Sequence, residues 1–405
     1  MKNTSDAARD LPRGMSRTGP VLFSYGFRPF FLAAALWAIA SIDLWIAYLN
    51  FGIPVASDYG TLYWHAHEML FGFAPAVLAG FLLTAIPNWT GRLPIAGRPL
   101  VVLFAVWCAG RLAMLLSGSI GIVAASAIDS LFLPVMLLVC AREVVAGKKW
   151  KDLKVIAGLF VLSLANLLFH VEVIGDVGPD VAIRLGIGAY VLLVTIVGGR
   201  ILPSFTRNWI NQFGRTDFPV PYNSFDAATI IVGAVALVLW ACLPDSTVAC
   251  GTAAVAAVLN TVRLVRWRGW TTWAEPILFV LHASFLFVPL GFAAISLQAS
   301  GWLPEVAVLH VFAIGTISMM MLAVMTRATR GHTGRKLKSS RMTNISYVLL
   351  GAVALIRPLA ELVPGLSTEI LIVAAVGWTA AFGLFAAEHA PLLWSGRKPL
   401  AVNGR

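Results

Sequence analysis

Charged residues are scarce in this chain. Asp, Glu, Lys and Arg make up 12% of its 405 residues, and 59% of the residues are hydrophobic. A soluble domain has about 25% charged residues, so the composition excludes an ordinary soluble protein. Apolar runs of about 20 residues, each long enough to cross a bilayer as a helix, follow one another along the chain. We therefore expect an all-α polytopic membrane protein.

Cysteine is also scarce, and no two of the four cysteines form a CxxC pair, which argues against a thiolate metal site. Cys242 and Cys250 bracket a short loop and could form a disulfide if that loop is extracytoplasmic. The simpler interpretation is that they are small apolar residues at helix ends. The first residues include several basic side chains but no early apolar core, so they do not predict a cleaved signal peptide.

Twelve membrane spans are expected from the apolar runs. Their predicted bounds are 30–49, 64–86, 100–116, 121–140, 155–173, 182–202, 226–243, 247–264, 276–297, 305–325, 344–363 and 369–388. We divide the chain into an N-terminal arm (1–29), a transmembrane bundle (30–388) and a C-terminal tail (389–405).

The basic residues predict the orientation of these spans. The net charge is +11, but the Lys and Arg residues fall in alternate loops, with the exceptions of Arg111, Arg184 and Arg357. The opposite loops contain acidic residues and no Lys or Arg. Because cytoplasmic loops are rich in Lys and Arg, both termini are expected in the cytoplasm, and the charge indicates topology rather than nucleic-acid binding.

A weak repeat links the inner ends of spans 2, 6 and 10. Thr90, Thr206 and Thr326 lie in similar polar segments and are spaced 116 and 120 residues apart. This spacing fits three four-helix units, although similar helix ends could also arise by coincidence.

Four histidines fall in the outer third of the predicted membrane. His65 and His67 open span 2, His170 lies near the outer end of span 5, and His310 lies one turn into span 10. Ionisable groups are expensive in a bilayer, so the layer predicts a functional site. Imidazoles on facing helices suit haem iron or copper. Residues two apart point about 200° apart on a helix, so His65 and His67 cannot both ligate one metal if span 2 is a regular helix there.

Charged side chains near this layer have two interpretations. Arg111 and Arg357 could hold the propionates of a haem, or could pair with Asp43 or Asp129. Glu68 follows His67 directly and is expected to relay protons or orient an imidazole, and we name it as the catalytic candidate.

Several linked motifs resemble the NnrS family. They are Tyr25-Gly26-Phe27-Arg28-Pro29-Phe30-Phe31, Trp64-His65-Ala66-His67-Glu68-Met69, Pro87-Asn88-Trp89-Thr90-Gly91-Arg92 and the stretch from Met325 through Arg335. The resemblance implies a haem- and copper-containing protein of the bacterial inner membrane, tied to nitric oxide metabolism, nitrosative stress and denitrification. It also implies that His282 and His332 are candidate metal ligands beside His65, His67, His170 and His310.

Our expectation is a haem-copper oxidoreductase that binds nitric oxide and reduces it. His65 or His67 would ligate a haem together with His310, and the other of the two would act with His170 to bind copper or shape the distal pocket. An electron donor such as a quinol is needed. Two alternatives stay open: a haem- or metal-binding stress protein without turnover, and a proton-coupled transporter.

Overall fold

The computed structural model describes residues 19–56 and 58–397, and these residues form helices without any β-strand. Within these described residues, twelve spans are long and apolar enough to cross a membrane. This confirms the expected all-α, multi-pass membrane protein. Residues 1–18 of the predicted arm and residues 398–405 of the predicted tail lie outside the described residues. The last helix ends at Trp394, so the first six residues of the predicted tail, 389–394, are helical.

The spans follow one another as expected, and two of them contain a π-helical segment. In order they are α1 (Phe27–Phe51); α2 (Thr61–His67), the π-helix Glu68–Phe73 and α3 (Ala74–Thr90); α4 (Arg98–Leu115); α6 (Ile122–Asp129) with α7 (Phe132–Ala146); α8 (Leu153–Ile174); α9 (Asp180–Asn211); α10 (Ser224–Cys242); α11 (Thr247–Arg266); α12 (Pro276–Ala299); α13 (Glu305–His310), the π-helix Val311–Ser318 and α14 (Met319–His332); α15 (Arg341–Ile356) with the 3-10 helix Arg357–Glu361; and α16 (Ser367–Trp394). A short helix, α5 (Ser117–Ile120), precedes α6.

Three helices run past prolines near which the sequence pattern predicted their ends. The helices α3, α9 and α16 continue through Pro87, Pro203 and Pro391. The predicted end of span 6 at residue 202 is therefore nine residues too early. A proline removes one backbone hydrogen bond, but membrane helices tolerate it because neighbouring groups satisfy the freed carbonyl.

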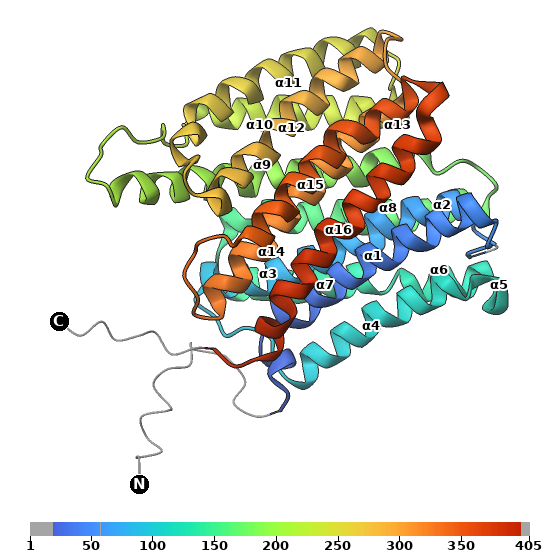
Figure 1. Ribbon diagram of the computed structural model, residues 1–405, viewed down its shortest axis with the longest axis horizontal. Coiled ribbons are helices and arrows are strands. Elements are labelled where there is room, and N and C mark those ends of the chain that lie inside the picture. Colours follow the sequence, from blue (N-terminus) through green and yellow to red (C-terminus); the bar gives the residue numbers. More distant parts are fainter. Residues whose placement is uncertain (1–18, 57, 398–405) are drawn as a thin grey trace.

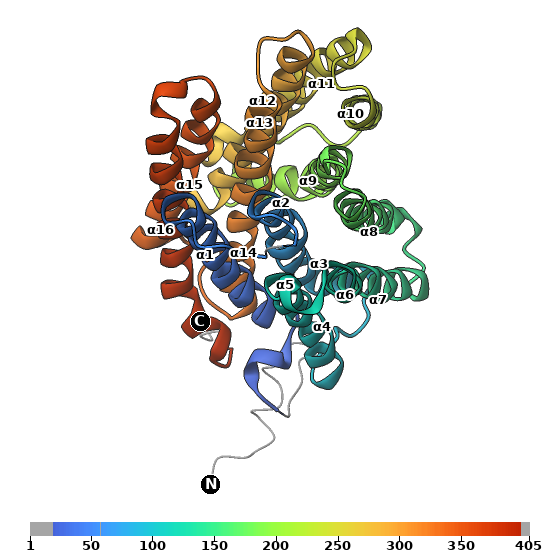
Figure 2. The same cartoon turned by 90° about the vertical axis from the view of Figure 1, so that its right-hand side faces the viewer.

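The spans that carry the weak repeat lie deep in the bundle. In the most apolar 18-residue stretch of each span, the share of buried residues is 83% for Thr61–Thr90, 61% for Asp180–Asn211 and 72% for Glu305–His332. It is at most 50% for eight of the other nine spans. The ninth span, Pro276–Ala299, is the exception at 72%. Figure 2 shows α2, α3 and α14 surrounded by the remaining helices. The burial agrees with a four-span period, and span 9 departs from it.

The first and last spans pack side by side, which closes the bundle (Figure 1). The indole of Trp378 on α16 donates to the backbone carbonyl of Ala38 on α1 at 2.8 Å. The buried guanidinium of Arg28 donates to the carbonyl of Leu393 at 2.8 Å and so satisfies the end of α16. Figure 1 places α2, α6 and α13 at the same end of the bundle. The helix α2 carries His65 and His67, and α13 ends at His310.

Candidate functional site

Two of the three spans that carry the four clustered histidines change from α-helix to π-helix directly after those histidines. His65 and His67 end α2 before the π-helix Glu68–Phe73, and His310 ends α13 before the π-helix Val311–Ser318. π-Helices are rare and are found mostly at functional sites.

Side chains from neighbouring helices support the first π-helix. Tyr190 donates its hydroxyl to the carbonyl of Leu70 at 3.0 Å, and Trp107 donates its indole N–H to the carbonyl of Gly72 at 3.0 Å. Both contacts come from other spans, so tertiary packing stabilises the π-helix that directly follows His65 and His67.

The side chains of His65 and His310 line one cavity of about 260 Å³. Its other walls are mostly apolar and include Met69, Phe73, Ile187, Leu309, Ile317 and Ala374. Arg357 and Asp180 add charged groups to the lining. An apolar cavity with a few converging polar groups is the usual form of a cofactor or ligand site.

The two imidazoles in this cavity have nitrogen atoms available for a ligand. The Nδ1 atom of His310 lies 2.7 Å from the carbonyl of Val306. Because only a protonated nitrogen can donate to a carbonyl, His310 carries its proton on Nδ1, and Nε2 keeps a lone pair. The His65 ring stacks on Trp45 with centroids 4.3 Å apart, and its buried Nδ1 has no partner among the described residues.

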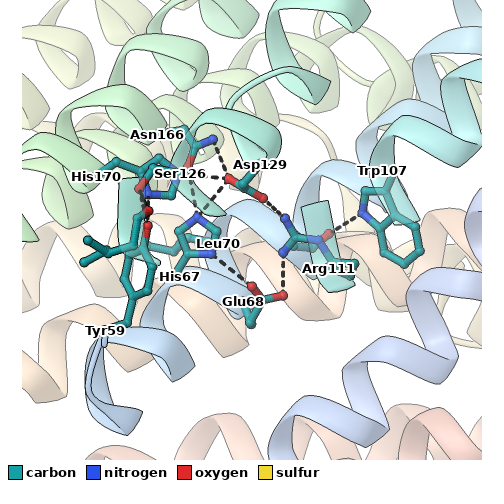
Figure 3. A network of polar contacts seen from close by, with 12 residues as sticks. Tyr59, His67, Glu68, Leu70, Trp107, Arg111, Ser126, Asp129, Asn166 and His170 are labelled. Atoms are coloured by element: carbon teal, nitrogen blue, oxygen red, sulfur yellow. Dashed lines mark hydrogen bonds and ion pairs between the residues drawn. The ribbon is translucent and has the colours of Figure 1, made fainter. Parts of the chain in front are cut away.

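A second group of histidines surrounds a buried carboxylate (Figure 3). The Oδ2 atom of Asp129 lies 3.1 Å from Nε2 of His67, 3.0 Å from Nε2 of His170 and 3.0 Å from the amide nitrogen of Asn166. One ligand atom from each of His67, Asp129 and His170 lies within 4.8 Å of the others. Two imidazoles and one carboxylate are a common ligand set for a transition metal. We call these three residues the His-Asp cluster.

Arg111 connects the His-Asp cluster to Glu68. One terminal nitrogen of its guanidinium donates to Glu68 and the other donates to Asp129. Glu68 also accepts a hydrogen bond from the Trp37 indole at 2.7 Å and lies 3.1 Å from Nδ1 of His67. All of these ionisable side chains are buried.

The charges in this network do not balance. Arg111 supplies one positive charge, whereas Glu68 and Asp129 supply two negative charges when ionised. An uncompensated buried charge is costly. The network therefore favours a further positive charge, which a proton on an imidazole or a metal cation at the His-Asp cluster would provide.

Tyr59 contacts the His-Asp cluster through His170. Its hydroxyl lies 2.9 Å from Nδ1 of His170 and also contacts the Ser126 hydroxyl. Burial raises the pKa of Tyr59 to about 12, and the carboxylates of Asp129 and Glu68 add to this rise while the Ser126 contact opposes it. The phenol is therefore neutral at physiological pH.

The structure divides the predicted site residues between two places. His65, His310 and Arg357 line the cavity. His67, His170, Glu68 and Arg111 lie in the polar network. Arg111 thus differs from the expectation that it would hold a propionate, because its two terminal nitrogens bond carboxylates and it does not line the cavity.

His282 and His332 lie apart from both places. The Nε2 atom of His282 lies 2.8 Å from the Thr206 hydroxyl, and His332 packs against the rings of Tyr25 and Phe27. Neither residue lines the cavity or belongs to the His-Asp cluster.

Sequence reasoning missed Asn166 and Tyr59 and named Asp129 only as a partner for an arginine. Asp129 and Asn166 each interrupt an apolar run, and that was the available signal.

No curated protein matches this chain in a sequence search. The family model described as NnrS protein matches residues 21–397, which is most of the chain. The matched range includes the twelve spans and all seven histidines. This family is related to nitric oxide in general terms. The chain therefore belongs to the NnrS family and is a nitric-oxide-related, multi-pass membrane protein.

Proposed function

We propose that this protein binds haem in the His65–His310 cavity and copper at the His-Asp cluster, and that it binds and reduces nitric oxide. The observation that carries the proposal is the division of four histidines between two adjacent sites. Each site receives histidines from two different spans.

The cavity suits a haem held by two imidazoles. His65 and His310 come from different helices, and the Nδ1 contact of His310 leaves Nε2 available as a ligand atom. Arg357 also lines the cavity, and its contact with Glu361 at 2.9 Å uses only one of its two terminal nitrogens. The remaining guanidinium donors could hold a propionate. The apolar walls would pack against the porphyrin.

The His-Asp cluster suits copper because imidazole is a preferred ligand of that metal. A bound cation would also balance the excess negative charge of Glu68 and Asp129 over Arg111. Asn166 and Tyr59 contact the cluster from the side and would hold the ligands in place.

Reduction of nitric oxide consumes protons as well as electrons, since two nitric oxide molecules, two electrons and two protons give nitrous oxide and water. Haem iron and copper supply redox chemistry and nitric oxide binding when they are bound. Glu68 is the candidate for proton relay, because its carboxylate lies 3.1 Å from Nδ1 of His67 in the buried network. The electrons would come from a donor such as a quinol.

The location that we propose is the bacterial inner membrane with both termini in the cytoplasm, which is supported by the alternation of basic and acidic loops. The histidines then lie toward the periplasmic face.

The test is metal analysis and a reduced-minus-oxidised optical spectrum of the detergent-purified protein. We expect His65→Ala and His310→Ala to lose the haem spectrum, and His67→Ala and His170→Ala to lose copper while keeping haem. His332→Ala is the control and should keep both, because that side chain lies outside both sites.

Two outcomes would point to other functions. A colourless, metal-free protein from cells supplied with haem and copper would contradict the proposal and favour a proton-coupled transporter. A haem spectrum without nitric oxide consumption under an electron supply would favour a binding protein without turnover.

A further inference from the structure

A second large cavity lies at the opposite end of the bundle from the clustered histidines. Its volume is about 960 Å³, and it lies between the loop before α8, the C-terminal half of α9 and the loop before α10. Six basic side chains line it: Lys148, Lys149, Lys151, Lys154, Arg200 and Arg207. We call this cavity the inner basic pocket.

Most of the positive charge in the inner basic pocket is not neutralised. Asp152 is the single acidic residue among the lining side chains, and it pairs with Arg200 at 2.8 Å. Arg207 stacks on the ring of Phe218 at 4.7 Å. None of the four lysines forms an ion pair within the part of the chain that the structure describes. Like charges gathered in one concave surface repel one another and attract an anion.

The lining also places the inner basic pocket at the boundary between lipid and water. The exposed aromatic residues Trp150 and Tyr222 line it beside the basic side chains. Such residues concentrate at the interface of a membrane. Arg200 lies over the ring of Trp89, with 4.8 Å from the guanidinium carbon to the ring centroid, which fixes the side chain in the wall.

The deeper wall of the pocket is apolar. Val197 precedes Arg200 by one helical turn, about 4.5 Å, and Val155 and Ile230 also line the pocket from neighbouring spans. One cavity thus offers cations at its mouth and aliphatic side chains at membrane depth. A small soluble anion would use only the cations, whereas a lipid would use both parts.

We propose that the inner basic pocket binds an anionic phospholipid, with the phosphate held by the lysines and Arg207 and an acyl chain against Val155, Val197 and Ile230. Basic pockets between membrane helices on the cytoplasmic side bind such headgroups. The proposal uses residues of α8, α9 and the neighbouring loops, and it does not depend on the haem and copper assignments.

The test is a binding titration of the purified full-length protein in detergent micelles with short-chain phosphatidylglycerol, and with phosphatidylcholine of the same chain length. We expect phosphatidylglycerol to bind at least about tenfold more tightly, since each nearby Lys adds to the attraction. The triple variant Lys149→Gln/Lys151→Gln/Lys154→Gln should lose this preference.

The matched control is Lys336→Gln/Lys338→Gln/Arg341→Gln, which removes the same charge from exposed residues of the loop before α15 and the first residue of that helix, outside this pocket. It should keep the preference for phosphatidylglycerol. An equal loss in both variants would overturn the proposal, because general charge attraction would then explain the binding.

Inorganic phosphate distinguishes the source of the anion. If it displaces phosphatidylglycerol at the same concentration, the lipid assignment is overturned in favour of a soluble phosphate site. Failure to compete supports the lipid. If the triple variant does not fold, Lys151→Gln alone should weaken phosphatidylglycerol binding and leave phosphatidylcholine binding unchanged, and an unchanged ratio would contradict the proposal.

Discussion

At the scale of single residues, Arg111 pairs with two carboxylates that are buried away from solvent. Its guanidinium bonds Glu68 and Asp129, and these side chains come from three different spans. A buried ion pair adds little stability relative to apolar packing, but the loss of one partner leaves the other charge unpaired. Arg111 therefore affects both the stability of the bundle and the position of the His-Asp cluster.

Replacing Arg111 with Met is expected to lower the free energy of unfolding by about 3–5 kcal/mol, because both carboxylates lose their cation. Denaturant titration in detergent would measure this change. Arg215→Met is the control: Arg215 forms an exposed pair with Asp217, and its loss should cost at most about 1 kcal/mol. Equal stability of the two variants would mean that Arg111 does not balance the buried charge.

Tyr59 gives a prediction for alkaline pH. Burial raises its pKa from 10.0 to about 12, so the unfolded chain releases this proton before the folded protein does. Its contribution to stability is complete below the unfolded pKa and is lost as the pH rises through the folded value. As the pH rises from the unfolded to the folded pKa, the free energy of unfolding of Tyr59→Phe should therefore fall less than that of the wild type.

Thermal unfolding in detergent as a function of pH would measure this difference. Tyr222→Phe is a suitable control, because the Tyr222 ring is exposed and its removal should leave the pH dependence unchanged. Parallel curves for Tyr59→Phe and the wild type would show that the phenol is not shielded.

At the scale of structural elements, the π-helix Glu68–Phe73 brings its backbone close to the charged network. A Cβ atom on Gly72 would overlap Nη1 of Arg111 and would lie 2.5 Å from Oε2 of Glu68 and 3.0 Å from Nε1 of Trp37. Glycine is thus required at this position because the charged side chains lie close to its backbone, and not because of an unusual backbone angle.

Gly72→Ala should destabilise the protein by about 1–3 kcal/mol, because the added methyl group forces the network apart. If the His-Asp cluster binds copper as proposed, the copper content of the purified protein should also fall. Gly383→Ala is the matched control in a helix: a Cβ there meets no atom within 4 Å, so the change should be neutral or add up to about 1 kcal/mol. The same unfolding midpoint for both variants would contradict this account.

At the scale of the whole molecule, the charges of the loops and the burial of the spans are independent observations. The loops predict the orientation of the bundle in the membrane. The burial of Thr61–Thr90 and Glu305–His332 shows that the spans with paired π-helices form the interior. The inner basic pocket and the histidine sites then lie at opposite ends of the same bundle.

Orientation can be measured with reporter fusions. Alkaline phosphatase fused after Gly178, in a predicted periplasmic loop, should be active, because the enzyme requires export. The same reporter fused after Lys149, in a predicted cytoplasmic loop, should be inactive. Fluorescent protein fusions at the two positions should give the reverse pattern. Activity at Lys149 would show that the bundle is inserted in the opposite orientation.

The sequence alone was sufficient for the twelve spans, because a bilayer requires long apolar runs and these can be counted without knowledge of packing. It also indicated a layer of four histidines, since depth follows from residue position along a span. It placed His65 and His67 on opposite faces for the same geometric reason.

Only the tertiary structure decided which histidines meet. It places His65 with His310 and His67 with His170, because the choice depends on how the spans rotate and pack. It assigns Arg111 to Glu68 and Asp129 instead of to the cavity. The π-helices were also beyond sequence reasoning, since contacts from Tyr190 and Trp107 on distant spans support the first of them. Each of these features depends on long-range contacts that no local pattern encodes.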